Sequence, residues 1–283
     1  MTDRTPDLVL IHGWGLGSAI WAPAVEKIET ETPHCRVHLI DLPGYSTTRS
    51  HLHKHAALEH APPAHALGET PPEAPPPPTF TETAARLTEM LRDNLPAGCI
   101  LCGWSLGSLL ALEIARCAPQ QIKGLILVGS TPSFTQRTGW RHAQPPALLD
   151  TFTDALRQNA EATLQRFIAV LNQGDAQART LSRQMTRLLM TSALPDPASL
   201  FAGLDWLREV DLRASIPSIA TPALLIHGEH DPLMPLAAAQ WLESQLPEAR
   251  LELFAGSAHA PFLADPERFA RLAAMFCHDL AAR

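Results

Sequence analysis

The chain has 283 residues, of which 46% are hydrophobic and 18% charged, so it can fill the core of one large domain or two small ones. Its net charge of −7 argues against a protein whose whole surface binds nucleic acid. Asp3 and Asp7 stand where a signal peptide needs basic and then apolar residues, and the longest nearly apolar run, 99–112, is too short to span a membrane. We therefore expect a cytoplasmic, monomeric protein that binds neither nucleic acid nor a membrane.

Short apolar runs alternate with helix-period segments along most of the chain. Helical patterns occur at 82–94, 107–117, 236–245 and 266–281, among others. The runs typical of buried strands are 8–12, 36–41, 99–103, 125–129, 223–228 and 251–256. Because apolar strands linked by helices form a parallel sheet covered on both faces, the pattern predicts an α/β fold with a mostly parallel, doubly wound sheet.

Two segments interrupt this alternation. Residues 51–78 are rich in histidine and proline and nearly free of large apolar side chains, which predicts a mobile surface insertion. A metal-binding tract at His51, His53 and His55 is the alternative, which we disfavour because no Cys or carboxylate cluster accompanies it. From 131 to 211 the pattern is helical, so we expect a helical lid inserted after the fourth strand, between core segments 1–130 and 212–283.

The sequence Gly-Trp-Ser-Leu-Gly at 103–107 follows a predicted strand and precedes an apolar helix. A serine on such a tight strand-to-helix turn needs glycines on either side, because side chains there would collide with the neighbouring strand and helix. The turn points the Ser105 hydroxyl outward, beside the positive end of the helix. The context therefore favours a nucleophile over an ordinary turn in which the serine only caps the helix.

A serine hydroxyl needs a base and a group that orients the base. His259 and Asp231 each follow the carboxyl end of a predicted strand, and the order Ser105, Asp231, His259 is the one that this strand–turn–helix architecture uses. Each residue alone could be structural, a loop histidine and a turn-forming aspartate. Three of them at matching strand ends favour a catalytic triad, with Asp231 preferred over Glu229 as the orienting group. His227, at the end of its strand, is expected to be buried, and His230 is a further competitor for a role in the site.

The glycine-rich segment 12–21 follows the first predicted strand. A tetrahedral oxyanion needs two N–H donors, and the best candidates are the backbone N–H groups of Leu106 and Trp14. A glycine-rich turn without a catalytic part is the alternative. Elsewhere, Cys99 and Cys102 spell a C-x-x-C pattern, but within a buried strand they point to opposite faces. We expect these two residues to pack as small apolar side chains, and we expect no disulfide framework from five irregularly spaced cysteines.

The segments HGWG, DLPGYS, GWSLG, HGEHDPLMP and AHAPFL together resemble the α/β-hydrolase superfamily. More narrowly, the chain is similar to the biotin-pathway pimeloyl-[acyl-carrier protein] methyl ester esterases. The resemblance implies a serine carboxylesterase that needs no metal or organic cofactor. It implies Ser105, Asp231 and His259 as the triad, with Trp14 and Leu106 at the substrate carbonyl.

The same resemblance assigns roles in the lid. The acyl chain of the substrate would be lined by Phe167, Ile168, Ala169, Val170 and Leu171. An acidic acyl-carrier protein would bind Arg166, Arg179 and Arg183, although a further lid arginine of the family is replaced here by Ala162. Between 137 and 187 the chain has seven arginines and four acidic residues, a local excess of positive charge on an anionic chain. Such a surface would steer an acidic partner, but scattered arginines on a solvated helix would give the same count.

Three departures from the family are visible. With only about seven residues before the first predicted strand, we expect the antiparallel strands that usually open this fold to be absent. Ser108 stands where the family has glycine, which should crowd the turn slightly, and segment 51–78 has no counterpart. Two other functions stay open: another esterase, thioesterase or acyltransferase of the same fold, and a binding protein that has kept the triad without turnover.

Overall fold

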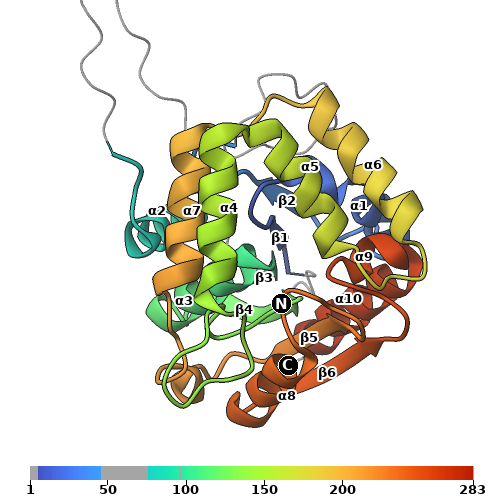
Figure 1. Ribbon diagram of the computed structural model, residues 1–283. Helices are drawn as coiled ribbons and strands as arrows, with labels where there is room; N and C mark the ends of the chain where they lie inside the picture. Colours follow the sequence, from blue (N-terminus) through green and yellow to red (C-terminus); the bar gives the residue numbers. More distant parts are fainter. Residues whose placement is uncertain (1–5, 46–75, 96, 283) are drawn as a thin grey trace, which may run out of the picture.

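A computed structural model describes residues 6–45, 76–95 and 97–282 (Figure 1). The segment predicted as a mobile insertion or a histidine tract lies almost wholly outside these residues. The described strands form one six-stranded sheet in the order β2-β1-β3-β4-β5-β6, with parallel pairing throughout. The strands are β1 Leu8–Ile11, β2 Val37–Ile40, β3 Cys99–Trp104, β4 Ile122–Val128, β5 Ala223–Gly228 and β6 Ala249–Phe254. The predicted α/β architecture is confirmed, and every predicted strand overlaps an observed one.

Helices cover both faces of the sheet, as the nearly continuous apolar strands require. On one face α1 (Ala22–Glu31) packs against α10 (Pro266–Ala281), and on the other α2 (Phe80–Asn94) packs against α3 (Leu106–Cys117) (Figure 1). Helix α8 (Leu236–Gln245) contacts β5 and β6. Three short helices complete this part: η1 (Ser18–Trp21), η2 (Ile216–Ser218) and α9 (Pro261–Ala264).

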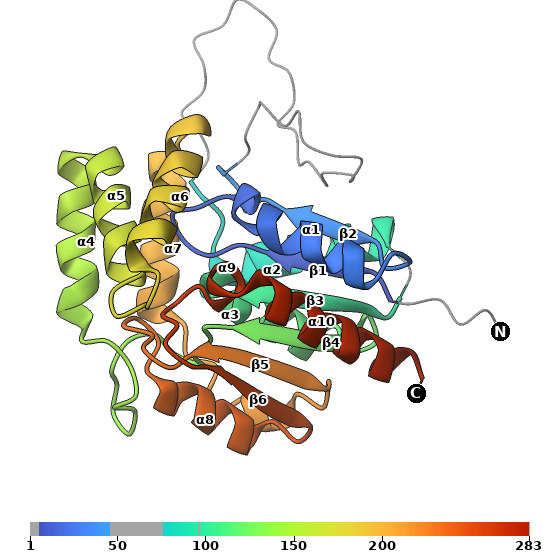
Figure 2. The same ribbon diagram turned by 90° about the vertical axis from the view of Figure 1, so that its right-hand side faces the viewer.

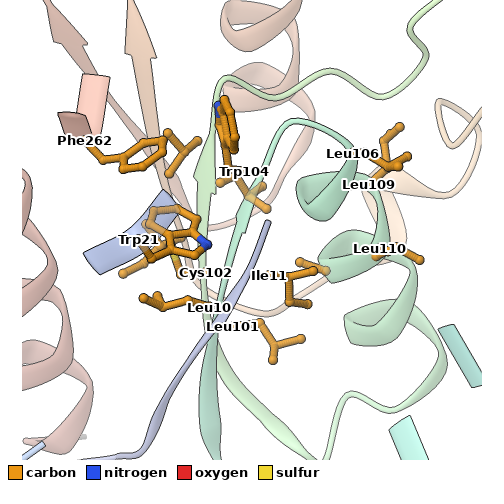
Figure 3. Packing of buried hydrophobic residues seen from close by; sticks show 14 of the residues in the cluster. Leu10, Ile11, Trp21, Leu101, Cys102, Trp104, Leu106, Leu109, Leu110 and Phe262 are labelled. Carbon is orange, nitrogen blue, oxygen red and sulfur yellow. The ribbon is translucent and has the colours of Figure 1, made fainter. Parts of the chain in front are cut away.

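The core lies between the sheet and these helices. Every residue of β1, β3 and β5 is buried, so side chains of both faces of each strand pack against helices. Figure 3 shows the two sides: Trp21 and Phe262 lie on one side of the strands, and Leu109 and Leu110 of α3 lie on the other. The Trp21 and Phe262 ring centroids are 4.2 Å apart. This packing fixes the position of each strand and therefore the position at which the loop after it begins.

Four helices occupy the chain between β4 and β5, and we call them the lid helices: α4 Pro146–Gln158, α5 Ala160–Leu171, α6 Ala178–Thr191 and α7 Pro197–Glu209. They stand together beyond one end of the sheet (Figure 2). Helix α6 buries Leu181, Met185 and Leu189, which recur every four residues and so share one face. In the described part of the chain, no helix is both long enough and apolar enough to cross a membrane.

Two strand glycines differ in what surrounds them. At Gly103 in β3, an added Cβ would lie 2.3 Å from the carbonyl oxygen of Gly107 and 2.6 Å from the Cα of Ser108. At Gly124 in β4, the nearest atom would be a methyl group of Leu280, at 2.3 Å. Backbone atoms cannot turn aside as a leucine side chain can, so β3 and α3 approach this closely only because residue 103 has no side chain.

The two glycines give a matched stability test. Gly103→Ala should destabilise the protein by about 3 kcal/mol, because the helix backbone must move, and Gly124→Ala should cost about half as much or less. The measurement is urea unfolding of the two purified variants beside the parent. Equal midpoints for the two variants would contradict the rigid approach of α3 to β3.

Candidate active site

Ser105 occupies a strained turn between β3 and α3. Its φ is +56° and its ψ −118°, and among the described residues it is the one non-glycine residue with positive φ. Such a conformation is costly for a residue with a Cβ and is maintained only by its surroundings. The Ser105 N–H donates to the Val128 carbonyl at 2.9 Å, and the Ser108 N–H donates to the Ser105 carbonyl at 2.9 Å. The turn is therefore fixed from both the sheet and the helix.

Ser108, which was expected to crowd this turn, makes a bond there. Its hydroxyl is fully buried and donates to the Ser105 carbonyl at 2.6 Å. The next glycine is also confined: an added Cβ at Gly107 would lie 2.4 Å from the carbonyl oxygen of Ile11 and 2.6 Å from that of His12. The start of α3 thus lies directly against the end of β1, and glycine is required there.

His259 and Asp231 form a buried pair. The Nδ1 atom of His259 lies 2.7 Å from Oδ2 of Asp231, and neither side chain is exposed to solvent. The other carboxylate oxygen, Oδ1, accepts the backbone N–H groups of Leu233 and Met234 at 2.9 and 2.8 Å. With both oxygens engaged, the carboxylate has one orientation, and it holds the imidazole with Nδ1 toward itself.

Opposing effects act on the pKa of Asp231. Burial alone would raise it, but the charge and hydrogen bond of His259, together with His227 and the Met234 N–H, lower it below the ordinary value of 3.8. The carboxylate is therefore ionised at neutral pH. A carboxylate in this position stabilises the imidazolium that forms when the ring accepts a proton.

The imidazole of His259 lies beside the Ser105 turn. The Trp104 indole N–H donates to the His259 carbonyl at 2.8 Å, and an added Cβ at Gly129 would lie 3.0 Å from the imidazole atoms Cε1 and Nδ1. Gly129 directly follows Val128, the residue that accepts the Ser105 N–H. Nε2 of His259 is among the buried polar atoms that have no hydrogen-bond partner in the described protein. The ring thus has its far nitrogen available for a hydroxyl or a substrate atom.

The loop after β1 covers the serine. An added Cβ at Gly13 would lie 3.1 Å from the Cβ of Ser105. Trp14 is 2% exposed, and its indole N–H donates to the Leu200 carbonyl of α7 at 2.8 Å. Since Leu106 is the first residue of α3, its N–H points out of the helix end rather than to an acceptor within the helix. Of the two candidate oxyanion donors, Trp14 is on the loop after β1 that covers Ser105, and Leu106 is at the start of α3 directly after it.

The predicted acyl-lining residues of α5 lie on different faces of the helix. Phe167, Ile168 and Leu171 are buried, Val170 is half-buried and Ala169 is exposed. The Phe167 ring packs edge-on against the Trp14 ring, with 4.9 Å between their centroids. The Phe152 ring of α4 packs edge-on against the Phe167 ring, with 5.8 Å between their centroids. The inward side of α5 thus forms an aromatic wall over the loop after β1, and Ala169 lies on the other side of the helix.

The three predicted carrier-binding arginines, Arg166, Arg179 and Arg183, are all exposed on α5 and α6. Within the described residues, none of them has an ion-pair partner or a side-chain hydrogen bond. Arg187 continues the series on α6 at the same four-residue spacing and is also exposed. A small hollow lies between this helix and the loop after β1, and its lining includes Gly15, Tyr45 and Leu189.

The other sequence candidates make different contacts. His227 is buried as expected, and its Nε2 donates to the Met234 carbonyl at 2.7 Å. Glu229 is exposed and accepts the Gly256 N–H at 2.9 Å, and His230 is exposed beside it. Of these groups, it is the Asp231 carboxylate that contacts His259.

The cysteines of the described chain are all free thiols. Cys99 and Cys102 are buried in β3, and burial raises the pKa of the Cys99 thiol to about 12 and that of Cys102 further. They stay protonated and pack as apolar groups, as the sequence analysis predicted. Cys35 and Cys277 are buried as well, whereas Cys117, at the end of α3, is exposed.

Some residues that shape the site were not identified from the sequence. Gly203 of α7 leaves space for the Trp14 ring, because an added Cβ at Gly203 would lie 2.5 Å from Cδ1 of the indole. Gly129 admits His259 in the same way, at a φ of +50°. Tyr45, within the quoted segment DLPGYS, accepts the Gly15 N–H with its hydroxyl at 3.1 Å. These residues matter through contacts with distant segments, which no local pattern reveals.

Serine, imidazole and carboxylate at the carboxyl edge of a parallel sheet define a hydrolase of the α/β class. The chain belongs to the α/β-hydrolase fold family, whose model matches residues 6–266. Proteins named pimeloyl-[acyl-carrier protein] methyl ester esterase from Vibrio campbellii and Aromatoleum aromaticum are 36% and 38% identical to it, each over 93% of this chain, and over 91% and 94% of their own lengths. The resemblance seen in the motifs is thereby confirmed.

Solved structures agree on the fold. An esterase from Exiguobacterium antarcticum superposes with a TM-score of 0.78 at 22% identity, covering 96% of this chain and 91% of that one. A bromoperoxidase from Bacillus anthracis superposes with a TM-score of 0.77 at 16% identity, covering 97% of this chain and 92% of that one. Proteins with such different names share the fold at this level of identity, so these likenesses speak for the architecture alone.

Two buried imidazoles beside the site link stability to pH. Burial, the largest effect, lowers the pKa of His12 and His227 below the ordinary value of 6.5, although Asp41 and Asp231 act in the opposite direction. As the pH falls below about 6.5, the unfolded chain binds protons before the folded one does, so stability is lost toward acid. We expect the Tm to fall between pH 7 and 5.5.

The pH effect can be assigned with two variants. His227→Gln keeps an N–H donor for the Met234 carbonyl but cannot be protonated, so its Tm should depend less steeply on pH. His278→Gln removes an exposed imidazole on α10 and should leave the slope as in the parent. A slope that is unchanged in His227→Gln would contradict the role of this residue.

Proposed function

We propose that this chain is a cytoplasmic, monomeric serine carboxylesterase that hydrolyses the methyl ester of pimeloyl-[acyl-carrier protein] in biotin biosynthesis. The products would be pimeloyl-[acyl-carrier protein], with a free carboxylate, and methanol. The proposal is carried by the buried His259–Asp231 pair beside the strained Ser105 turn. The name shared by the relatives supports the choice of substrate.

The triad would act in two steps. Ser105 Oγ attacks the ester carbonyl while His259 Nε2 accepts the hydroxyl proton, and Asp231 stabilises the imidazolium. The N–H groups of Leu106 and Trp14 bind the oxyanion. The carbon–oxygen bond to the methoxy group breaks, and His259 delivers its proton to the departing methanol. A water molecule, deprotonated by His259, then attacks the acyl-enzyme and releases the carboxylate and Ser105.

The lid helices would select the substrate. The apolar wall of Trp14, Phe152 and Phe167 would lie along the methylene chain, with Ile168 and Leu171 behind it. The exposed arginines at 166, 179 and 183 would bind the acidic carrier. Catalysis needs no metal or organic cofactor in this scheme.

A substrate panel tests the assignment directly. The carrier-bound pimeloyl methyl ester should be cleaved with a far higher kcat/KM than short p-nitrophenyl esters. Cleavage of the small esters with no action on the carrier-bound ester would favour another esterase, thioesterase or acyltransferase. Growth of a biotin-requiring strain that lacks its own esterase, when supplied with this gene, is the matching test in cells.

Ser105→Ala tests the nucleophile. Hydrolysis should fall by about 10⁴-fold or more, because removing the nucleophile of a triad leaves only binding and the oxyanion donors. The Tm should stay near that of the parent, since alanine keeps the Cβ and the backbone hydrogen bonds of the turn are unchanged. A fluorophosphonate probe should label the parent and the control Ser244→Ala, in which an exposed serine of α8 is removed, but not Ser105→Ala. Turnover near the parent rate in Ser105→Ala would rule out this nucleophile.

Reversing two lid charges tests the carrier surface. In Arg179→Glu/Arg183→Glu, kcat/KM for the carrier-bound ester should fall by about 10-fold or more, since repulsion slows the encounter. A small free ester should react within about 2-fold of the parent rate. The control Arg92→Glu/Arg271→Glu makes the same change in net charge on α2 and α10, away from the lid. Equal losses for both substrates, or equal losses in both double variants, would contradict a specific docking surface.

A further inference from the structure

The turn between α5 and α6 is bonded to the loop that carries His259. We call residues 172–177 the lid turn and residues 255–260 the histidine loop. The Ala176 N–H donates to the Gly256 carbonyl at 2.9 Å, and the His259 N–H donates to the Leu171 carbonyl, at the end of α5, at 3.2 Å. The two segments are separated by strands β5 and β6 in the sequence, yet their backbones are directly joined.

The Asp175 side chain of the lid turn forms hydrogen bonds with the histidine loop. Its Oδ2 accepts the Ala258 N–H at 2.8 Å and the Ser257 hydroxyl at 3.3 Å. Its Oδ1 accepts the Gln177 N–H at 2.7 Å. The residue is 8% exposed, so these bonds form largely out of water. The bond from the Ala258 N–H fixes the residue immediately before His259.

The Asp175 carboxylate lies just before the start of helix α6. The helix begins at Ala178 with Gln177 in the capping position, where no side-chain cap is formed. The bond from Oδ1 to Gln177 closes a local turn within the lid, but the bonds from Oδ2 go to another part of the fold. A purely local role would therefore explain only one of the three contacts.

We propose that Asp175 is a positioning residue for the catalytic imidazole: it holds the histidine loop so that His259 faces Ser105. The inference rests on the proposed function, because it takes His259 as the base. A shift of the Ala258 backbone passes directly into the next residue, and small displacements of a catalytic group slow a reaction strongly. Since Asp175 belongs to the lid, the orientation of the base depends on how the lid helices are seated.

Steady-state kinetics of Asp175→Ala with a small ester give the first test. The kcat should fall by about 10- to 100-fold with KM within about 3-fold, because substrate contacts are unchanged while the base is displaced. Asp175→Asn can keep its carbonyl oxygen on the Ala258 N–H and should regain most of the lost kcat. Asp154→Ala removes an exposed acid of α4 and should behave as the parent. Assays run well below the Tm of every variant separate positioning from unfolding.

Two NMR measurements report on positioning without turnover. In Asp175→Ala the Ala258 amide should exchange with solvent faster, and the downfield His259 Nδ1 proton should broaden or disappear. Asp154→Ala and Asp175→Asn should keep both signals. If Ser105→Ala retains turnover, the proposed function fails, but these signals still test how the imidazole is held. A parental kcat in Asp175→Ala, or a lowered kcat with both signals unchanged, would overturn the positioning role.

Discussion

The site depends on backbone segments that approach one another where a side chain is missing. The closest example joins the two loops of the acid and the base: an added Cβ at Gly228 would lie 1.8 Å from the carbonyl oxygen of Ala258. Gly228 ends the strand that leads to Asp231, and Ala258 precedes His259, so this approach sets the separation of the hydrogen-bonded pair. Gly103 and Gly107 do the same for the serine turn. Catalytic geometry at this edge is thus set by where glycines stand in the parallel strands and their loops, more than by the reactive residues themselves.

Much of this arrangement could be predicted from the sequence, because its signals are local. Buried parallel strands are continuous apolar runs, and a serine between two glycines after such a run has few other uses. Strand β4 begins at Ile122 rather than at 125, since Lys123 and Gly124 interrupt the apolar run. What could not be predicted depends on contacts between distant segments: Gly129 beneath His259, Gly203 beside Trp14, and Asp175 against the histidine loop. Ala169 differs for another reason, since a run of five consecutive residues on a helix cannot face one direction.

The lid helices combine two surfaces that act at different distances. Inward, aromatic rings and aliphatic side chains contact the loop after β1 through van der Waals packing and a bond from the Trp14 indole to α7. Outward, arginines free of ion-pair partners within the described chain set up a positive field that extends into solvent over about 10 Å at moderate ionic strength. In the proposed function, the same helices attract an acidic partner and form the apolar side of the site. The hydrogen bonds between the lid turn and the histidine loop connect the lid helices to the segment that carries the His259 imidazole.

The distribution of thiols has a practical consequence. Four of the five cysteines are enclosed in the interior, and only Cys117 is open to reagents. Cys117 is the last residue of α3, and Ser105 directly precedes the first residue of the same helix. A fluorophore or spin label on Cys117 would therefore be attached at the opposite end of α3 from the reacting hydroxyl. Distances from that label to a second one introduced on α5 or α6 would report the position of the lid helices without first removing the native cysteines.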